Sequence, residues 1–159
     1  MTLRYTLFAP LLVCAACHHS TAIPDPAPDT KPSAVVSEQS AQRSVETWGD
    51  FLTYFDGETF STRDLLNGVA IIKPGQEIHP PHRHAEEEFL MVIEGNGRWH
   101  LNGEDFAASA GDTLYAAPWD IHGITNTGDT PLRFVVWKWA SQAQPLPTDP
   151  QSPATDGTL

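Results

Sequence analysis

The sequence predicts an all-β fold, arranged as a two-sheet jelly roll or small barrel, and three observations support this prediction. Short apolar runs recur at close intervals from Leu65 onward, and glycine, proline, asparagine or aspartate separates them. No long segment of this region keeps a helical period. Asn102 and Gly103 are typical of a two-residue hairpin turn, because both positions of such a turn favour positive φ.

Turn residues bound the predicted strands in the first half of the domain. Pro74 and Gly75 close one apolar run, and Gly95 with its neighbours stops a later one. The hairpin turn at Asn102 then separates two short strands. In chain order, this half contains the predicted strands 68–73, 76–84, 88–94, 98–101 and 104–107.

The second half repeats the pattern and completes about eight strands. Its predicted strands are 112–117, 121–126 and 132–139, and residues 128–131 turn the chain before the last of them. Eight antiparallel strands suit a jelly roll or a small barrel. With 159 residues, of which 40% are hydrophobic, the chain can build one core. We therefore predict a single barrel domain over residues 65–140.

The segment before the barrel, residues 45–64, is predicted as an arm whose structure is open between two alternatives. Its apolar residues allow a helix, whereas Asp56 and Gly57 indicate a hairpin, which we favour. The aromatic side chains of the arm need cover, either from its own barrel or from a second copy in a homodimer. These side chains are Trp48, Phe51, Tyr54 and Phe55.

The N-terminus has the layout of an export signal. Residues 1–16 contain Arg4 and an apolar run too short to span a bilayer, and two alanines precede Cys17. Residues 13–17 resemble a bacterial lipoprotein cleavage box, which implies lipidation at Cys17. Cleavage into a soluble periplasmic protein is the alternative. We expect an exported protein, periplasmic or tethered to the outer membrane, that meets the membrane only through its lipid anchor.

Composition assigns the remaining segments and excludes some partners. Residues 17–44 are rich in proline and are predicted as a tether, and residues 141–159 as a disordered tail. Both cysteines lie in the leader, so the mature domain has no internal disulfide. The net charge of −11 argues against binding to nucleic acid.

Four side chains suggest a site for one divalent metal ion. Residues two apart on a strand point to the same face, so His82 and His84 can converge. Glu88 follows after a turn, and His122 arrives from a later strand that only the fold could bring alongside. Three nitrogens and one carboxylate suit Fe, Mn, Ni, Cu or Zn, and the sequence does not choose among them.

These residues resemble the two sequence motifs of the cupin superfamily, in its single-domain microbial form. Gly75, His82, His84, Glu88 and Gly95 are similar to the first motif, and Gly111, His122 and Asn126 to the second. Trp119 stands where the second motif usually has glycine, which is expected to change the barrel mouth. The resemblance implies a cupin jelly-roll barrel in which His82, His84, Glu88 and His122 bind one metal ion.

The resemblance also implies a range of functions. We expect a metal-binding protein of the cell envelope, an enzyme of dioxygenase or isomerase type that acts on a small oxygen-rich molecule. A receptor that binds a sugar or a phenol without turnover is the alternative. His79 is a candidate catalytic acid or base at the pocket rim, and Tyr115 and Trp119 are candidates for substrate contact.

Overall fold

The computed structural model describes residues 31–151 of the chain. The predicted signal peptide, Cys17 as the site of lipidation and the first half of the tether lie outside the described residues, as do residues 152–159. Within residues 31–151, no helix is long and apolar enough to cross a membrane.

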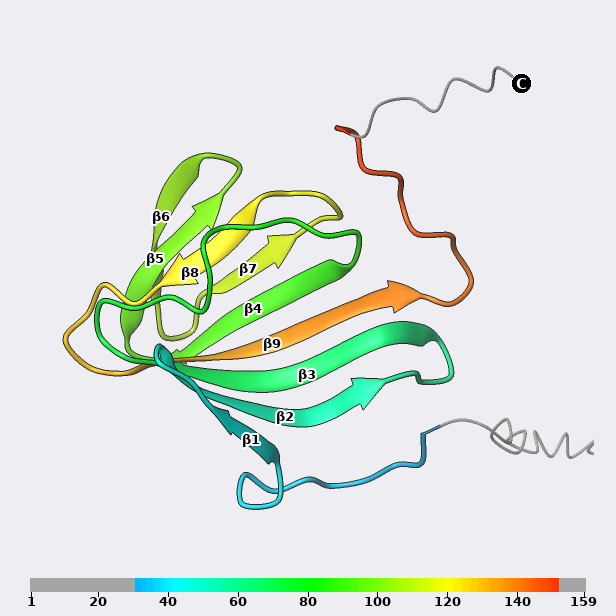
Figure 1. Cartoon of the computed structure of the whole chain (residues 1–159), viewed down its shortest axis with the longest axis horizontal. Helices are drawn as coiled ribbons and strands as arrows, with labels where there is room; N and C mark the ends of the chain where they lie inside the picture. Colours follow the sequence, from blue (N-terminus) through cyan, green and yellow to red (C-terminus); the bar gives the residue numbers. More distant parts are fainter. Residues whose placement is uncertain (1–30, 152–159) are drawn as a thin grey trace, which may run out of the picture.

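The described residues form nine strands in two sheets, which confirms the all-β prediction (Figure 1). The larger sheet has the order β1-β2-β3-β9-β4-β7, and the smaller sheet has the order β6-β5-β8. The strands are β1 (Gln42–Val45), β2 (Gly49–Gly57), β3 (Thr62–Ile72), β4 (Glu87–Glu94), β5 (Asn96–Leu101), β6 (Glu104–Ser109), β7 (Thr113–Ala116), β8 (His122–Thr125) and β9 (Leu132–Ser141). The paired strands are antiparallel, and the last strand, β9, lies between β3 and β4.

The core forms where apolar side chains of both sheets meet. Strand β9 contributes the buried residues Leu132, Phe134 and Val136 at alternate positions, as expected for a strand with one face inward. Leu90 and Val92 of β4 follow the same rule. The same alternation includes two charged residues. Lys138 follows Val136 in β9 and Glu88 precedes Leu90 in β4, so both side chains lie on the interior face. One end of the barrel is therefore polar.

The prediction of a strand over residues 76–84 is wrong. This segment is part of an irregular connection between β3 and β4, in which Glu77 and His82 make isolated bridges to Thr125 and His122. Pro80 and its neighbour Pro81 explain the difference, because proline has no backbone N–H to donate to a strand ladder.

The arm is a hairpin that belongs to the larger sheet. Strand β2 runs through Asp56 and ends at Gly57, so the turn lies at residues 58–61, later than predicted. Thr59 stabilises this turn, because its hydroxyl oxygen accepts a hydrogen bond from the backbone N–H of Thr62 at 3.2 Å. Trp48 and Phe51 pack against the barrel core. For these two aromatics, the cover comes from the chain's own barrel.

The part of the predicted tail that the structure describes lies on the barrel. Beyond β9, the guanidinium of Arg63 donates to the carbonyl oxygen of Gln144 at 3.0 Å. Arg83 makes an ion pair with Asp149, also at 3.0 Å. Residues 142–151 are thus held by side chains of the barrel and of the connection between β3 and β4.

Two glycines with positive φ, Gly95 and Gly75, differ in the space around them, so their replacement by alanine should lower the stability of the fold by different amounts. Gly95 (φ 82°) joins β4 to β5, and a Cβ there would lie 2.6 Å from the carbonyl oxygen of Pro131. Gly75 (φ 73°) has open space around the same position. We expect Gly75→Ala to lower the free energy of unfolding by about 1 kcal/mol, from backbone strain alone. Gly95→Ala should cost about 2 to 3 kcal/mol, because the backbone clash adds to that strain.

Urea unfolding of the two variants measures the difference. Equal losses for Gly75→Ala and Gly95→Ala would contradict the contact that the structure places between Gly95 and Pro131.

Candidate metal centre

Two segments far apart in sequence bring the predicted metal ligands together. His82 and His84 lie in the connection between β3 and β4, Glu88 lies in β4, and His122 begins β8. The backbone N–H of His82 donates to the carbonyl oxygen of His122 at 3.0 Å, and the N–H of His122 donates back at 2.9 Å. This reciprocal bridge sets the two histidines side by side.

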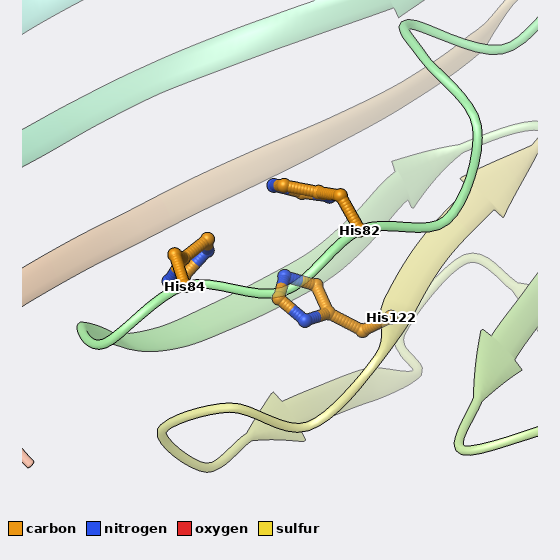
Figure 2. Close-up of side chains that lie close together, drawn as sticks. All are labelled: His82, His84 and His122. Atoms are coloured by element: carbon orange, nitrogen blue, oxygen red, sulfur yellow. The ribbon is translucent and has the colours of Figure 1, made fainter. Parts of the chain in front are cut away.

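The three imidazole rings face one another (Figure 2). The centroid of the His82 ring lies 5.2 Å from that of His84 and 4.9 Å from that of His122, and the remaining pair is also 4.9 Å apart. One nitrogen from each ring can be chosen so that all three lie within 4.8 Å of one another. Such spacing leaves room for one ion between them.

Glu88 adds a carboxylate to this group. Its Oε2 atom lies 2.9 Å from Nε2 of His84 and 3.6 Å from Nε2 of His122. Glu88 is 8% exposed and His122 is 1% exposed. A buried carboxylate is stable only beside groups that compensate its charge, and the histidines or a bound cation supply that compensation.

Backbone carbonyl oxygens orient two of the rings. Nδ1 of His122 donates to the carbonyl oxygen of Asp120 at 2.8 Å, and Nδ1 of His84 donates to that of Glu86 at 3.1 Å. These bonds leave Nε2 of each ring facing Glu88 and the centre of the group, where it donates to the carboxylate when it carries a proton and would offer its lone pair to a metal ion. Orientation of this kind accompanies metal-ligating histidines.

Unpartnered nitrogen atoms show that the residues fit a metal ion. Nδ1 of His82 and Nε2 of His122 are buried and have no hydrogen-bond partner among the described residues. Buried polar atoms in proteins almost always have a partner. A divalent ion between the rings would satisfy both nitrogens, and three nitrogens with one carboxylate suit a transition metal.

The protonation states suit the same role. Burial, followed by the neighbouring His79, His122 and His84, lowers the pKa of His82 to about 4, so its ring is neutral near pH 7. Burial acts to raise the pKa of Glu88, but the imidazoles of His122 and His84 outweigh it and bring this pKa to about 2. The site therefore offers the lone pair of His82 and the negative charge of Glu88 near pH 7. Burial acts to lower the pKa of His122, but its hydrogen bonds to Glu88 and to the backbone of Asp120 outweigh burial and raise this pKa, so His122 releases a proton when it binds a metal ion.

A small cavity opens beside these donors. Its volume is about 170 Å³, and it is lined by Phe51, Leu66, Ile78, His79, His82, Glu88, Phe134, Val136 and Lys138. His79, the predicted acid or base, is exposed at its edge, and the centroid of its ring lies 4.0 Å from that of His82. The structure thus brings His79 to the cavity, where its catalytic role stays a prediction.

Tyr115 and Trp119, predicted to contact substrate, do not line this cavity. Tyr115 is 44% exposed, donates from its hydroxyl to Glu87 at 2.8 Å, and lines a separate cavity of about 480 Å³. Trp119 donates from Nε1 to the carbonyl oxygen of Pro147 at 2.9 Å. The sequence placed both residues near the second motif, but the structure engages their polar groups with Glu87 and Pro147 outside this cavity.

Sequence reasoning missed Lys138 as a lining residue. The signal was present, because Lys138 continues the alternation of Leu132, Phe134 and Val136, which are the inward residues of the last strand. The orienting carbonyl oxygens of Glu86 and Asp120 carry no signal of their own in the sequence, because every residue has such an oxygen.

Comparison with known proteins shows which class of proteins has this fold and these candidate metal-binding residues. Residues 68–138 match the Cupin domain family. The structure resembles that of an RmlC-like cupin from Shewanella frigidimarina NCIMB 400 with a TM-score of 0.54 and 18% identity, over 70% of this chain and 96% of the other. Residues 68–138 therefore form a cupin domain, and the structure has the all-β cupin fold.

Two relatives are similar in sequence over about half of the chain. A gentisate 1,2-dioxygenase from Streptomyces sp is 32% identical over 82 residues, which are 51% of this chain and 23% of that protein. A dimethylsulfoniopropionate lyase from Ruegeria pomeroyi is 34% identical over 90 residues, or 55% of this chain and 58% of that protein. The matched part is therefore well under two thirds of either relative's length.

Proposed function

We propose that this protein is a metal-dependent cupin enzyme that acts on a small oxygen-rich molecule, by reaction with dioxygen or by isomerisation. One observation carries the proposal. Three imidazoles and the buried carboxylate of Glu88 meet beside a cavity, and two of the imidazole nitrogens have no partner among the described residues. The similarity to a gentisate 1,2-dioxygenase supports the oxygen chemistry.

The residues of the cavity have distinct tasks in this proposal. His82, His84, Glu88 and His122 would hold the ion. A bound divalent ion supplies Lewis acidity to a substrate with two neighbouring oxygens, and ferrous iron supplies reactivity towards dioxygen. The apolar lining excludes water from the bound substrate. His79, whose ring centroid lies 4.0 Å from that of His82, would accept or return a proton.

Oxygen uptake tests the proposal against its alternative. The protein is loaded with ferrous iron without oxygen and then offered aerated diols, phenols and keto acids. We expect oxygen consumption with at least one substrate class above that of metal-free protein and of free iron. If the reaction is an isomerisation, NMR under anaerobic conditions detects the product without oxygen uptake. If a molecule binds to the protein but gives neither oxygen uptake nor a new product, the protein is a receptor without turnover.

A further inference from the structure

The cavity beside the candidate metal ligands contains a lysine that the metal site does not use. Lys138 of β9 lies opposite Glu88 of β4 in the strand register, and it lines the same cavity as His82. Directly opposed residues on one face of a sheet have neighbouring side chains. The side chain of Lys138 therefore starts beside that of Glu88 on the interior face of the larger sheet and lines the cavity.

Lys138 differs from the other cations of the strand domain in having no partner. Arg63 and Lys73 donate to backbone carbonyl oxygens. Four arginines make ion pairs with carboxylates; these are Arg43, Arg83, Arg98 and Arg133. For Lys138, residues 31–151 provide neither a hydrogen bond nor a carboxylate oxygen within 4.0 Å.

The nearest acid in the register is already engaged. Oε2 of Glu88 lies 2.9 Å from His84, and this carboxylate also faces His122. Lys138 is half-buried among apolar side chains such as Leu66 and Val136. Nζ of Lys138 is not among the buried polar atoms that lack a partner, so water can reach it. This ammonium group is therefore free to pair with an anion that enters the cavity.

The charge of the filled site leads to the same conclusion. The protein as a whole carries a net charge of −11, yet a divalent ion with the carboxylate of Glu88 and the ammonium of Lys138 would make this cavity positive. Close opposite charges in a partly buried site attract more strongly than they do in water. A neutral molecule would leave this positive charge uncompensated, whereas a carboxylate would neutralise part of it.

We infer that Lys138 binds the anionic group of the substrate, and that the substrate is a small carboxylate and not a neutral diol or sugar. This inference rests on the proposed function, because the cavity is that of the proposed metal site. The volume of about 170 Å³ lies below the roughly 300 Å³ at which sites for drug-sized molecules begin. An acid of few carbon atoms fits this size.

Calorimetric titration of the zinc-loaded protein tests the inference with two pairs of probes. Glycolate is compared with ethylene glycol, and salicylate with salicylamide, so that each acid has a neutral analogue. We expect the wild-type protein to bind each acid more tightly than its analogue. Lys138→Met should weaken binding of the acids by about 10-fold to 100-fold, the effect of one charge-assisted hydrogen bond, and leave the neutral probes unchanged.

Two further variants separate the role of Lys138 from general charge. Lys138→Arg keeps the cation and should retain the preference for acids. Lys73→Met makes the same change in net charge outside the cavity, where Lys73 donates to the carbonyl oxygen of Thr47, and should bind the acids as the wild type does. A Lys138→Met protein that binds acids as tightly as the wild type would overturn the inference, and so would a wild type without the preference.

Zinc binding distinguishes a failure of the proposed role of Lys138 from a failure of the proposed function. Lys138 is not among the candidate metal ligands, so Lys138→Met should bind zinc as the wild type does. A wild type that binds no zinc would refute the metal site. Titration of the metal-free wild type and Lys138→Met proteins with the same acids would then decide the role of Lys138 on its own.

Discussion

Replacing His122 with alanine should abolish stoichiometric binding of a divalent metal ion. His122 is 1% exposed, its Nδ1 is held by the carbonyl oxygen of Asp120, and its Nε2 is buried without a partner. Loss of a group that merely orients a ligand weakens metal binding by about 10-fold to 100-fold. Removal of a whole donor should therefore weaken zinc binding by more than about 100-fold.

Metal analysis of purified protein and zinc titration measure this effect. His100→Ala is the matched control, because His100 lies outside the group and pairs with Asp105 at 3.0 Å. The control should bind zinc as the wild type does, and circular dichroism should show that both variants keep their β structure. If His122→Ala and wild-type protein carry the same amount of metal, the site does not bind it through this residue.

Asn126→Ala should destabilise the fold by about 4 kcal/mol. The side chain of Asn126 is fully buried and makes three hydrogen bonds to the backbone. Its Nδ2 donates to the carbonyl oxygens of Ile72 and Thr130, both at 2.8 Å, and its Oδ1 accepts from Gly128 at 2.9 Å. Each buried backbone group left without a partner costs about 1 to 3 kcal/mol.

Such a loss is a large part of the total stability of a domain of this size, which is typically about 5 to 15 kcal/mol. Chemical denaturation measures the change in the free energy of unfolding. Asn96→Ala is the control, because Asn96 is exposed and an exposed substitution away from special contacts changes stability by about 0.5 kcal/mol at most. Similar losses for the two variants would show that the three bonds of Asn126 do not stabilise the fold.

The role of Asn126 illustrates what a motif can and cannot predict. The sequence places Asn126 in the second cupin-like motif, but the motif does not say what the residue does. In the structure it joins the end of β3 to the turn before β9, which are distant in sequence. A separate backbone bond supports the connection that carries His82, because the N–H of Asn126 donates to the carbonyl oxygen of Gln76 at 2.9 Å.

Trp119 shows how a departure from a motif is accommodated. The sequence puts a bulky residue at a usual glycine position, and the structure gives Trp119 a φ of 70°, in the left-handed region that glycine adopts without strain. The indole donates to the carbonyl oxygen of Pro147 in the segment beyond β9. This contact partner could not be predicted, because proline-rich composition indicates an extended chain but not the surface on which it lies.

Local patterns in the sequence were enough for the all-β class and for most of the strands. His82 and His84 were predicted to converge as residues two apart on a strand, but both lie in an irregular connection, so the two rings meet for another reason than the one predicted. Alternation, turn residues and short ligand spacing act over a few residues, so they can be read without a fold. The mistaken strand over residues 76–84 failed on the same local scale, since two prolines there remove backbone donors.

The folded arrangement alone decides which distant residues meet. His122 reaches His82 through a reciprocal backbone bridge, and Lys138 reaches Glu88 through the register of β9 beside β4. Pairing between strands depends on the free energy of the whole sheet, which no short stretch of sequence contains. For that reason the complete candidate metal site and the residues that line its cavity are properties of the tertiary structure.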